Sequence, residues 1–242
     1  MRWAVVSDIH ANLEALDAVL ADLERQRPGA IVCLGDFVGY GASPNECIER
    51  LRPLLAAAVI GNHDLAACRG DGLEWFTGDA ARAARWTDTV LTPAHRDWLL
   101  GLPYTAVYRG TRLVHASPAH PEEWSYVLSA GDAEAELAAF AEPVGFIGHS
   151  HFPGAFERDA TGGVRYTREP LVTMASGCRY LVNVPSVGQP RDADPRAGYL
   201  MVDEEARTLA HVRLGYDVGA ARRRIEAAGL PRFLGARLER GE

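Results

Sequence analysis

The residues best suited to chemistry stand in five short polar segments, each of which follows an apolar run of the chain. They are Asp8, His10, Asp36, Asn62, His63, Asp64, His115, His149 and His151. Imidazole nitrogens combined with carboxylate oxygens suit borderline transition metals such as Mn, Fe, Zn or Ni, whereas calcium and magnesium sites are built from oxygen ligands. Because a carboxylate can also bridge two ions, the sequence predicts a transition-metal centre of one or two ions.

Taken singly, each of these segments is weak evidence. Short histidine motifs arise by chance, and a lone buried histidine is usually a hydrogen-bonded core residue. The occurrence of all five segments in one chain favours a ligand site. Five of the eight histidines directly follow an apolar, strand-like run, and each lies in a polar cluster. Five unrelated core histidines would not be expected to share this context.

The elements that must position these segments follow a β-α-β-α-β pattern over the first sixty residues. Apolar runs predict strands at Arg2–Ser7, Ala30–Leu34 and Ala56–Ile60. Leucines at helical spacing predict a helix from Asn12, and Ser43 begins a proline-containing capping box that predicts a second. Parallel strands joined in this way carry ligands at their carboxyl ends, so we expect the polar segments to meet at one sheet edge.

The remainder of the chain is helical first and then rich in strands. Residues Leu65–Leu100 are rich in alanine, and we interpret them as a possible helical cap. Strands are predicted at Tyr104–Tyr108, Thr111–Ala116, Val144–Ile147, Gly154–Arg158, Val164–Thr167, Leu181–Val184, Gly198–Val202 and Arg207–Leu214, and helices at Asp132–Ala141 and from Asp217 onward. The basic run Arg222–Arg224 is interpreted as a solvated face. Since no repeat or linker interrupts the pattern, we expect one domain spanning residues 1–242.

Composition and charge narrow the classes of partner. The 25 basic and 32 acidic residues give the 242-residue chain a net charge of −7, so a nucleic-acid polymer or an anionic membrane is a poor partner. Any phosphate must therefore be bound by a local positive source, such as a metal or a few arginines. No apolar run reaches the roughly 20 residues of a membrane span. The four cysteines show no C-x-x-C spacing, which indicates reduced thiols and a cytoplasmic protein. An oligomer is compatible with the sequence.

The order of the polar segments resembles that of a known family. Asp8-x-His10, Gly35-Asp36, Gly61-Asn62-His63-Asp64, His115 and Gly148-His149-x-His151 resemble the calcineurin-like metallophosphoesterases over about residues 2–190. The segments Gly35–Gly41 and Pro185–Arg191 resemble the small bacterial and archaeal phosphodiesterase-like branch. The resemblance implies an α/β fold, a four-layer α/β/β/α sandwich of two mixed sheets with flanking helices.

The same resemblance implies a role for each ligand. Asp8, His10 and His151 would hold one metal ion, Asn62, His115 and His149 a second, and Asp36 would bridge them. A hydroxide bridging the ions would attack phosphorus. His63 would stabilise the transition state or protonate the leaving oxygen, and Asp64 would orient the His63 imidazole. The charges of two divalent ions, two carboxylates and one hydroxide leave a local excess of about +1, which suits a phosphate.

Several functions remain open at this point. The branch resemblance favours hydrolysis of phosphodiesters or of nucleotide phosphoanhydrides such as dinucleoside polyphosphates. The alternatives are a phosphomonoesterase acting on proteins or small molecules, and a non-catalytic metal-dependent scaffold, which the complete ligand set disfavours. Candidate substrate contacts are Tyr40, Arg191 and His120. The aromatic residues Trp75, Phe76 and Trp86 are interpreted as helix-packing core, with base stacking as the alternative.

Overall fold

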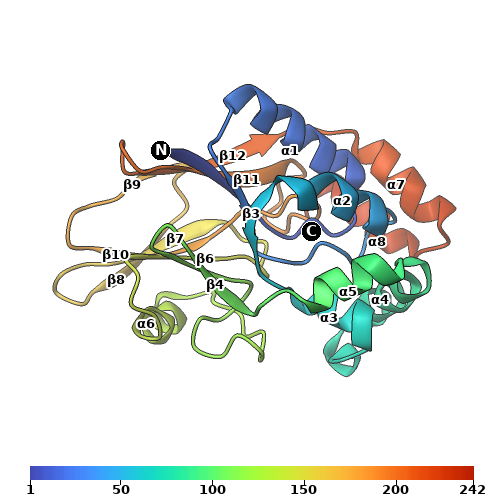
Figure 1. The fold of residues 1–242 in the computed structure, drawn as a ribbon, viewed down its shortest axis with the longest axis horizontal. Coiled ribbons are helices and arrows are strands. Elements are labelled where there is room, and N and C mark those ends of the chain that lie inside the picture. Colours follow the sequence, from blue (N-terminus) through green and yellow to red (C-terminus); the bar gives the residue numbers. More distant parts are fainter.

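Two six-stranded sheets pack face to face at the centre of the computed structural model, which describes residues 1–242 (Figure 1). The first sheet contains β1 (Arg2–Val6), β2 (Ile31–Cys33), β3 (Leu55–Ala58), β9 (Leu171–Thr173), β11 (Ala197–Asp203) and β12 (Thr208–Leu214). The second contains β4 (Thr105–Tyr108), β5 (Thr111–Val114), β6 (Val144–Ile147), β7 (Gly154–Arg158), β8 (Val164–Thr167) and β10 (Arg179–Asn183). Their strand orders are β3-β2-β1-β11-β12-β9 and β4-β5-β6-β10-β7-β8.

Both sheets are mixed. β1, β2 and β3 run parallel, as do β5, β6 and β10, whereas the remaining neighbours pair antiparallel. The parallel strands therefore send their carboxyl ends, and the polar segments that follow them, to a common edge of each sheet. This is the geometry that the sequence pattern predicts.

Helices cover the outer faces of the two sheets (Figure 1). They are α1 (Leu13–Gln26), α2 (Pro44–Leu51), α3 (Asn62–Arg69), α4 (Gly78–Val90), α5 (Pro93–Leu100), α6 (Ala130–Ala138), α7 (Val218–Ala227) and α8 (Arg232–Ala236), with 3-10 turns η1 (Arg52–Leu54), η2 (Leu73–Trp75) and η3 (Arg237–Glu239). In the figure α1, α2 and α7 lie over the first sheet, and α6 lies on the far side of the second. The predicted four-layer α/β/β/α arrangement is confirmed.

The alternation of side chains along β1 shows how the layers are held together. Trp3 and Val5 point between the sheets, where they join a buried cluster that includes Phe146 of β6. Ala4 and Val6 point to the other face and pack in the cluster that contains Leu16 of α1. Because successive residues of a strand face opposite sides, one apolar run supplies both cores. The strand is thus fixed from both faces, and so is the loop at its carboxyl end.

Local predictions differ from the structure at a few places. Asn12 caps α1 through its side chain, which accepts a 3.2 Å hydrogen bond from the Ala15 backbone. The helix start predicted at Ser43 is confirmed, with Ser43 at the N-cap and Pro44 first in α2, but the capping box is wrong because the Ser43 hydroxyl makes no hydrogen bond. Strand β9 was not predicted, because three residues are too few to show an alternating pattern.

The helical segment after β3 begins earlier than predicted, with Asn62 inside the first turn of α3. Its helices α3, α4 and α5 gather at one end of the molecule beside α8 (Figure 1). Within this segment, residues 71–80 contribute one wall of the cleft described below. No helix of the structure has the length and apolar character needed to cross a membrane.

Candidate metal centre

The predicted ligands form two adjoining groups at the carboxyl ends of the strands. In the first group, single ligand atoms of Asp8, His10 and His151 all lie within 4.8 Å of one another. In the second group the same holds for Asp36, His115 and His149. These side chains follow β1, β2, β5 and β6, so four loops far apart in sequence meet at one place. The Asn62 carboxamide oxygen lies 3.2 Å from His115 Nε2, which adds it to the second group.

Asp36 lies between the two groups. Its Oδ1 accepts a 2.8 Å hydrogen bond from the backbone N–H of His63 at the start of α3. Its Oδ2 lies 3.6 Å from His10 Nε2 and 3.3 Å from His115 Nε2, which belong to different groups. One oxygen is therefore fixed by the protein and the other faces both groups. This is the arrangement that a bridging carboxylate requires.

Backbone carbonyls orient three of the imidazoles. The Nδ1 atoms face backbone oxygens, those of Val38 for His10 at 3.2 Å, Leu34 for His115 at 2.8 Å, and Gln189 for His151. When Nδ1 carries the proton, Nε2 presents its lone pair to the centre, as in most metal-binding histidines. The Nε2 atoms of His10 and His151 are 3.1 Å apart, and a cation would stabilise two lone pairs that face each other so closely. The donor set therefore fits transition-metal ions.

The protonation states agree with metal binding. Burial lowers the pKa of His10 and His151, and it lowers that of His149 to about 3, so these rings are neutral. Burial would also lower the pKa of His115, but the adjacent Asp36 carboxylate raises it to about 9. Burial acts to raise the pKa of Asp36, yet the neighbouring histidines hold it well below its usual range. Charged carboxylates among mainly neutral imidazoles are the forms that bind metals.

The backbone at the ligands is strained. Asp8, His10, Asp36, His149 and His151 all have positive φ angles, between 49° and 63°. This left-handed conformation costs roughly 1–2 kcal/mol for a residue with a side chain. Hydrogen bonds between the loops hold it: the N–H of His10 donates to the Asp36 carbonyl at 2.9 Å, and the N–H of His149 donates to the Asp8 carboxylate at 3.2 Å. Five ligands are therefore directed by a backbone that the fold enforces.

Two glycines allow the loops to approach this closely. A Cβ atom at Gly148 would lie 2.5 Å from Asp8 Oδ2, and one at Gly61 would lie 2.1 Å from Asp36 Oδ1. Both distances are shorter than van der Waals contact, so any side chain there would displace a ligand. The glycine that precedes each ligand in the sequence motif is thus needed for space.

Asp64 has different partners from those expected. Its two carboxylate oxygens accept hydrogen bonds from the backbone N–H groups of Asp36, Val38 and Gly61, at 2.8 to 3.1 Å. It makes no hydrogen bond to the His63 imidazole, whose Nδ1 is buried without a partner. Burial raises the pKa of Asp64 to about 8. Asp64 therefore ties the loop after β2 to the start of α3, and so positions Asp36 and Asn62 rather than His63.

The loop after β10 supports the first group from behind. The Ser186 hydroxyl donates a 3.0 Å hydrogen bond to the Asp8 carbonyl, and the Gly188 N–H donates to the same oxygen at 2.9 Å. A Cβ atom at Gly188 would clash with the Ile9 carbonyl. Gln189 supplies the carbonyl that faces His151. Arg191 lies two residues after Gln189. This loop therefore directs its side chain toward the cleft beside the metal ligands.

A cleft of about 460 Å³ opens beside the second group of ligands. It is lined by Tyr40, Asn62, His63, Asp71, Gly72, Trp75, Phe76, Thr77, Ala80, Glu123, Trp124, Tyr126, His149, Arg191 and Arg237. Two of the three predicted substrate contacts, Tyr40 and Arg191, are among them. His120 is not, because it lies exposed on the loop after β5, 4.0 Å from Glu123.

The cleft has aromatic walls. Tyr126 stacks on His149 with ring centroids 4.2 Å apart, and Phe76 lies 4.5 Å from His63. Trp75 is 79% exposed at the rim, which contradicts its interpretation as core, whereas Trp86 packs in a helical cluster as predicted. Tyr126 was not among the residues predicted from the sequence, although it is one of two aromatic residues, Trp124 and Tyr126, that follow the His115 strand.

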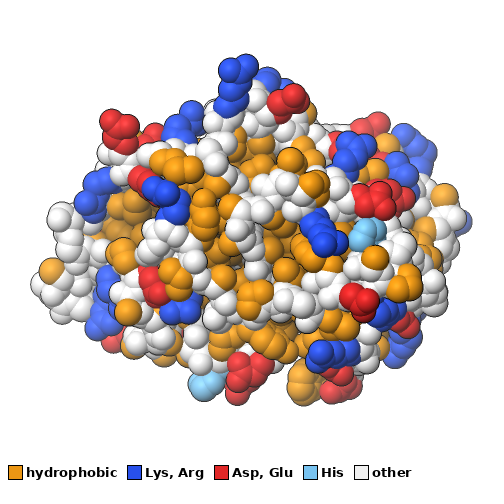
Figure 2. Space-filling model, viewed as in Figure 1, with side chains coloured by type: hydrophobic (Ala, Val, Ile, Leu, Met, Phe, Trp, Pro, Cys, Tyr) orange, Lys and Arg blue, Asp and Glu red, His pale blue; other side chains and the backbone are white.

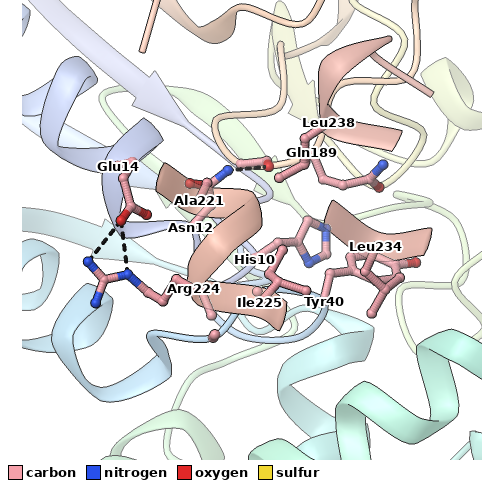
Figure 3. Close-up of a pocket in the computed structure, with 14 residues that line it drawn as sticks. His10, Asn12, Glu14, Tyr40, Gln189, Ala221, Arg224, Ile225, Leu234 and Leu238 are labelled. Atoms are coloured by element: carbon pink, nitrogen blue, oxygen red, sulfur yellow. Dashed lines mark hydrogen bonds and ion pairs between the residues drawn. The ribbon is translucent and has the colours of Figure 1, made fainter. Parts of the chain in front are cut away.

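Behind the metal ligands the C-terminal helices close the structure (Figure 3). Ile225 of α7 and Leu234 of α8 pack with Tyr40 in one buried cluster, and Arg224 forms an ion pair with Glu14 of α1. The pocket between them and His10 has a volume of only about 10 Å³, room for about one water molecule. It is a packing gap, so ligands must enter from the cleft on the other side of Tyr40.

The sequence and the fold define the class of protein. Residues 1–207 match the sequence model of the calcineurin-like phosphoesterase superfamily domain, so the chain belongs to that family. The resemblance noted in the five motifs is confirmed, and the chain is a metal-dependent phosphoesterase.

Individual relatives extend this similarity over the whole chain. The uncharacterized protein MJ0912 of Methanocaldococcus jannaschii is 38% identical over 239 residues, which cover 97% of this chain and 96% of that protein. The crystal structure of a metallophosphoesterase from Sphaerobacter thermophilus has a TM-score of 0.88 at 37% identity, covering 100% of this chain and 99% of that one. The hypothetical protein PH1004 from Pyrococcus horikoshii OT3 has a TM-score of 0.82 at 20% identity, with 100% and 98% covered, and shares the fold.

Proposed function

We propose that the protein is a dinuclear-metal phosphoesterase that hydrolyses phosphodiester or nucleotide phosphoanhydride bonds in small molecules. The observation that carries this proposal is the position of Asp36, whose Oδ2 faces His10 in one ligand group and His115 in the other. A carboxylate oxygen shared in this way suits two adjacent ions. Asp8, His10 and His151 would hold one ion, Asn62, His115 and His149 the second.

When bound, such ions acidify water and offset the negative charge on the phosphoryl oxygens. The protein's own side chains would orient the substrate. His63 adjoins the ligand Asn62 and lines the cleft, where its ring packs between Tyr40 and Phe76 at centroid distances of 4.4 and 4.5 Å. From this position it can donate a hydrogen bond to the leaving oxygen of a substrate. Asp64 has no direct part in the reaction, since it holds backbone groups.

The shape and lining of the cleft support a small, aromatic substrate. A volume of about 460 Å³ falls within the range of small-molecule sites, roughly 300–1,000 Å³. Aromatic rings of Phe76, Trp124 and Tyr126 can stack on a nucleobase. On the face shown in Figure 2, arginine side chains alternate with acidic ones and form no continuous basic stripe of the kind that nucleic-acid polymers require.

The test is turnover by purified protein loaded with Mn²⁺. We expect hydrolysis of bis-p-nitrophenyl phosphate to exceed that of p-nitrophenyl phosphate in kcat/KM. An Asp36→Ala variant, purified and loaded in the same way, excludes a contaminating phosphatase. A tenfold preference for the monoester would replace the phosphodiesterase assignment by a phosphomonoesterase. Inertness toward a broad panel of phosphoesters and nucleotides, with metal demonstrably bound, would favour a scaffold.

Metal identity and location are separate parts of the proposal. Nitrogen and oxygen ligands of this kind accept Mn, Fe, Zn or Ni, so elemental analysis of the purified protein is the appropriate measurement. We also propose a cytoplasmic location. It is supported by four cysteines that are all free, three of them buried, since reduced thiols persist in reducing compartments.

A further inference from the structure

Two arginines converge on one tyrosine at the end of the cleft. Arg191 donates a 3.0 Å hydrogen bond to the Tyr40 hydroxyl, and its guanidinium carbon lies 5.9 Å from the centre of the Tyr40 ring. The guanidinium carbon of Arg237 lies 5.8 Å from the same ring. Arg237 belongs to η3, beyond residues 1–207 that match the family, and buried Leu238 anchors that turn against Tyr40.

Neither arginine has an acidic partner. The other contacts of Arg191 include the Gln189 amide oxygen, 3.1 Å away, and Arg237 donates to the backbone oxygen of Glu242. No aspartate or glutamate side chain lies within ion-pair distance of either guanidinium, although Asp71 and Glu123 line the cleft and are exposed. Two other partly buried arginines do form ion pairs, Arg112 with Glu142 and Arg213 with Asp192, whereas Arg179 donates to backbone carbonyls instead.

Two like charges in one partly buried site repel each other unless an anion lies between them. Burial lowers the pKa of Arg237 and the charge of Arg191 lowers it further, while Tyr40 and Glu242 offset part of this shift. The protein retains this unfavourable arrangement within a chain of net charge −7 that has 32 acidic residues available as partners. Acidic groups act on these arginines only from a distance, Glu242 on Arg237 and Asp8 on Arg191, and neither guanidinium forms an ion pair. Guanidinium groups left without an ion pair in a cleft are expected of an anion-binding site.

This pair is displaced from the metal ligands by the width of one aromatic ring. The Tyr40 ring lies 4.6 Å from the His10 ring and 4.4 Å from the His63 ring, and both guanidinium carbons lie within 6 Å of the centre of the same Tyr40 ring. An anion held by the arginines is therefore a neighbour of the phosphoryl group at the metal ligands. At this separation, such an anion would be a second charged group of the same substrate.

We propose that Arg191 and Arg237 form a second anion subsite, which binds the phosphate adjoining the one that is attacked and so selects substrates with a phosphoanhydride chain. The inference rests on the proposed function and names its substrate class: nucleoside and dinucleoside polyphosphates in preference to simple phosphodiesters. In the reaction, the water oxygen forms one new P–O bond and its proton passes to solvent or to the leaving oxygen, while one P–O–P bond breaks. The departing phosphate keeps the electron pair, and the two guanidinium groups stabilise its negative charge.

The experiment compares two substrates in three variants, all loaded with Mn²⁺. The substrates are diadenosine tetraphosphate, which has a phosphoanhydride chain, and bis-p-nitrophenyl phosphate, which has none. For Arg237→Gln and Arg191→Gln we expect the ratio of kcat/KM on the tetraphosphate to that on the diester to fall about tenfold to a hundredfold. Arg232→Gln is the matched control, because Arg232 is exposed on α8, outside the cleft, and makes no ion pair; its ratio should equal that of the wild type.

Other results are decisive in the opposite direction. An unchanged ratio in Arg237→Gln, or an equal loss on both substrates, would overturn the subsite. Thermal unfolding of each variant identifies a loss caused by misfolding, and Arg237→Lys, which keeps the charge, should then recover part of the ratio.

If the wild type hydrolyses neither substrate, the proposed function fails and a binding measurement decides the inference alone. Isothermal titration of metal-free protein with inorganic pyrophosphate should show binding by the wild type and by Arg232→Gln. Binding at least tenfold weaker is expected for Arg237→Gln. Equal binding by all three proteins would contradict the subsite.

Discussion

The metal centre and the rest of the cleft are built by different means. All seven ligands are buried, and their backbone is fixed by hydrogen bonds among loops that end strands of two sheets. The rest of the cleft is lined by the exposed Trp75, the half-exposed Tyr126, which stacks on His149, and two arginines that form no ion pair. The difference indicates that the sheets determine which chemistry the protein performs. The helical segment after β3 and the turn η3 determine which substrates bind beside the metal centre.

The largest effect on activity is expected when the carboxylate shared by the two ligand groups is removed. Asp36→Ala deletes the oxygen that faces both groups, and we expect a loss of at least about a thousandfold in kcat, with less than the wild-type metal content. Turnover assays with elemental analysis of the same sample measure both effects. Activity within tenfold of the wild type would show that the two groups work independently.

A methyl group at Gly148 should lower the activity nearly as much, although it removes no ligand. The new Cβ of Gly148→Ala would lie 2.1 Å from Ser7 Oγ and 2.5 Å from Asp8 Oδ2, so Asp8 must move. We expect a loss of several hundredfold in activity, and destabilisation of about 1–3 kcal/mol in chemical denaturation. Gly78→Ala is the control, because nothing lies within 4 Å of that position. If both variants behave alike, the close packing of the loops is not essential.

His63 lies at the boundary between the two regions. A ligand atom of His63 lies within 4.8 Å of ligand atoms of His10 and Asp36, but seven other side chains already supply the two ligand groups. We therefore expect His63→Ala to retain both metal ions yet lose about a hundredfold in turnover if the ring assists the leaving group. Elemental analysis must accompany the kinetics, since a variant that also loses metal would make His63 part of the centre. Full activity in a fully metallated variant would remove His63 from the reaction.

The smallest effect is expected at the rim. Trp75→Ala should lower kcat/KM on nucleotide substrates less than tenfold and leave bis-p-nitrophenyl phosphate nearly unaffected, because an exposed ring contributes stacking alone. Trp75→Phe should restore most of the loss. Equal effects on both substrates would indicate that Trp75 supports the structure of the cleft and does not contact the nucleobase. The proposed division of roles between the metal centre and the rest of the cleft would then be wrong at this position.

The metal centre could be predicted from sequence because its residues are chemically unusual and stand at a fixed place relative to strands. Histidine and aspartate after apolar runs are visible without coordinates, and parallel pairing brings their loops to one edge. The four-layer fold was predicted from the family resemblance of these segments, with which the β-α-β start agrees. The partners of Asp64 were not visible, because a carboxylate that accepts backbone hydrogen bonds has the same sequence context as one that orients an imidazole.

The rest of the cleft could not be predicted in the same way. Arg237 stands 86 positions after His151, the last of the predicted ligands, in a tail with many arginines, and only the packing of Leu238 against Tyr40 brings it to the cleft. Trp75 has the composition of a buried helix residue, and its exposure depends on the turn η2. Such positions depend on tertiary packing of short elements, for which a sequence pattern carries little information.

The left-handed backbone at Asp8, Asp36 and His149 has a consequence for how ions are acquired. The hydrogen bonds that hold these conformations join protein groups alone, so the energetic cost of arranging the ligands is met during folding, before any ion arrives. Chelation should accordingly leave the circular dichroism spectrum intact, and a second type of ion should restore the enzyme without refolding. Which metal the cell's enzyme contains would then depend on intracellular supply and affinity, and not on which ion was present when the chain was synthesised.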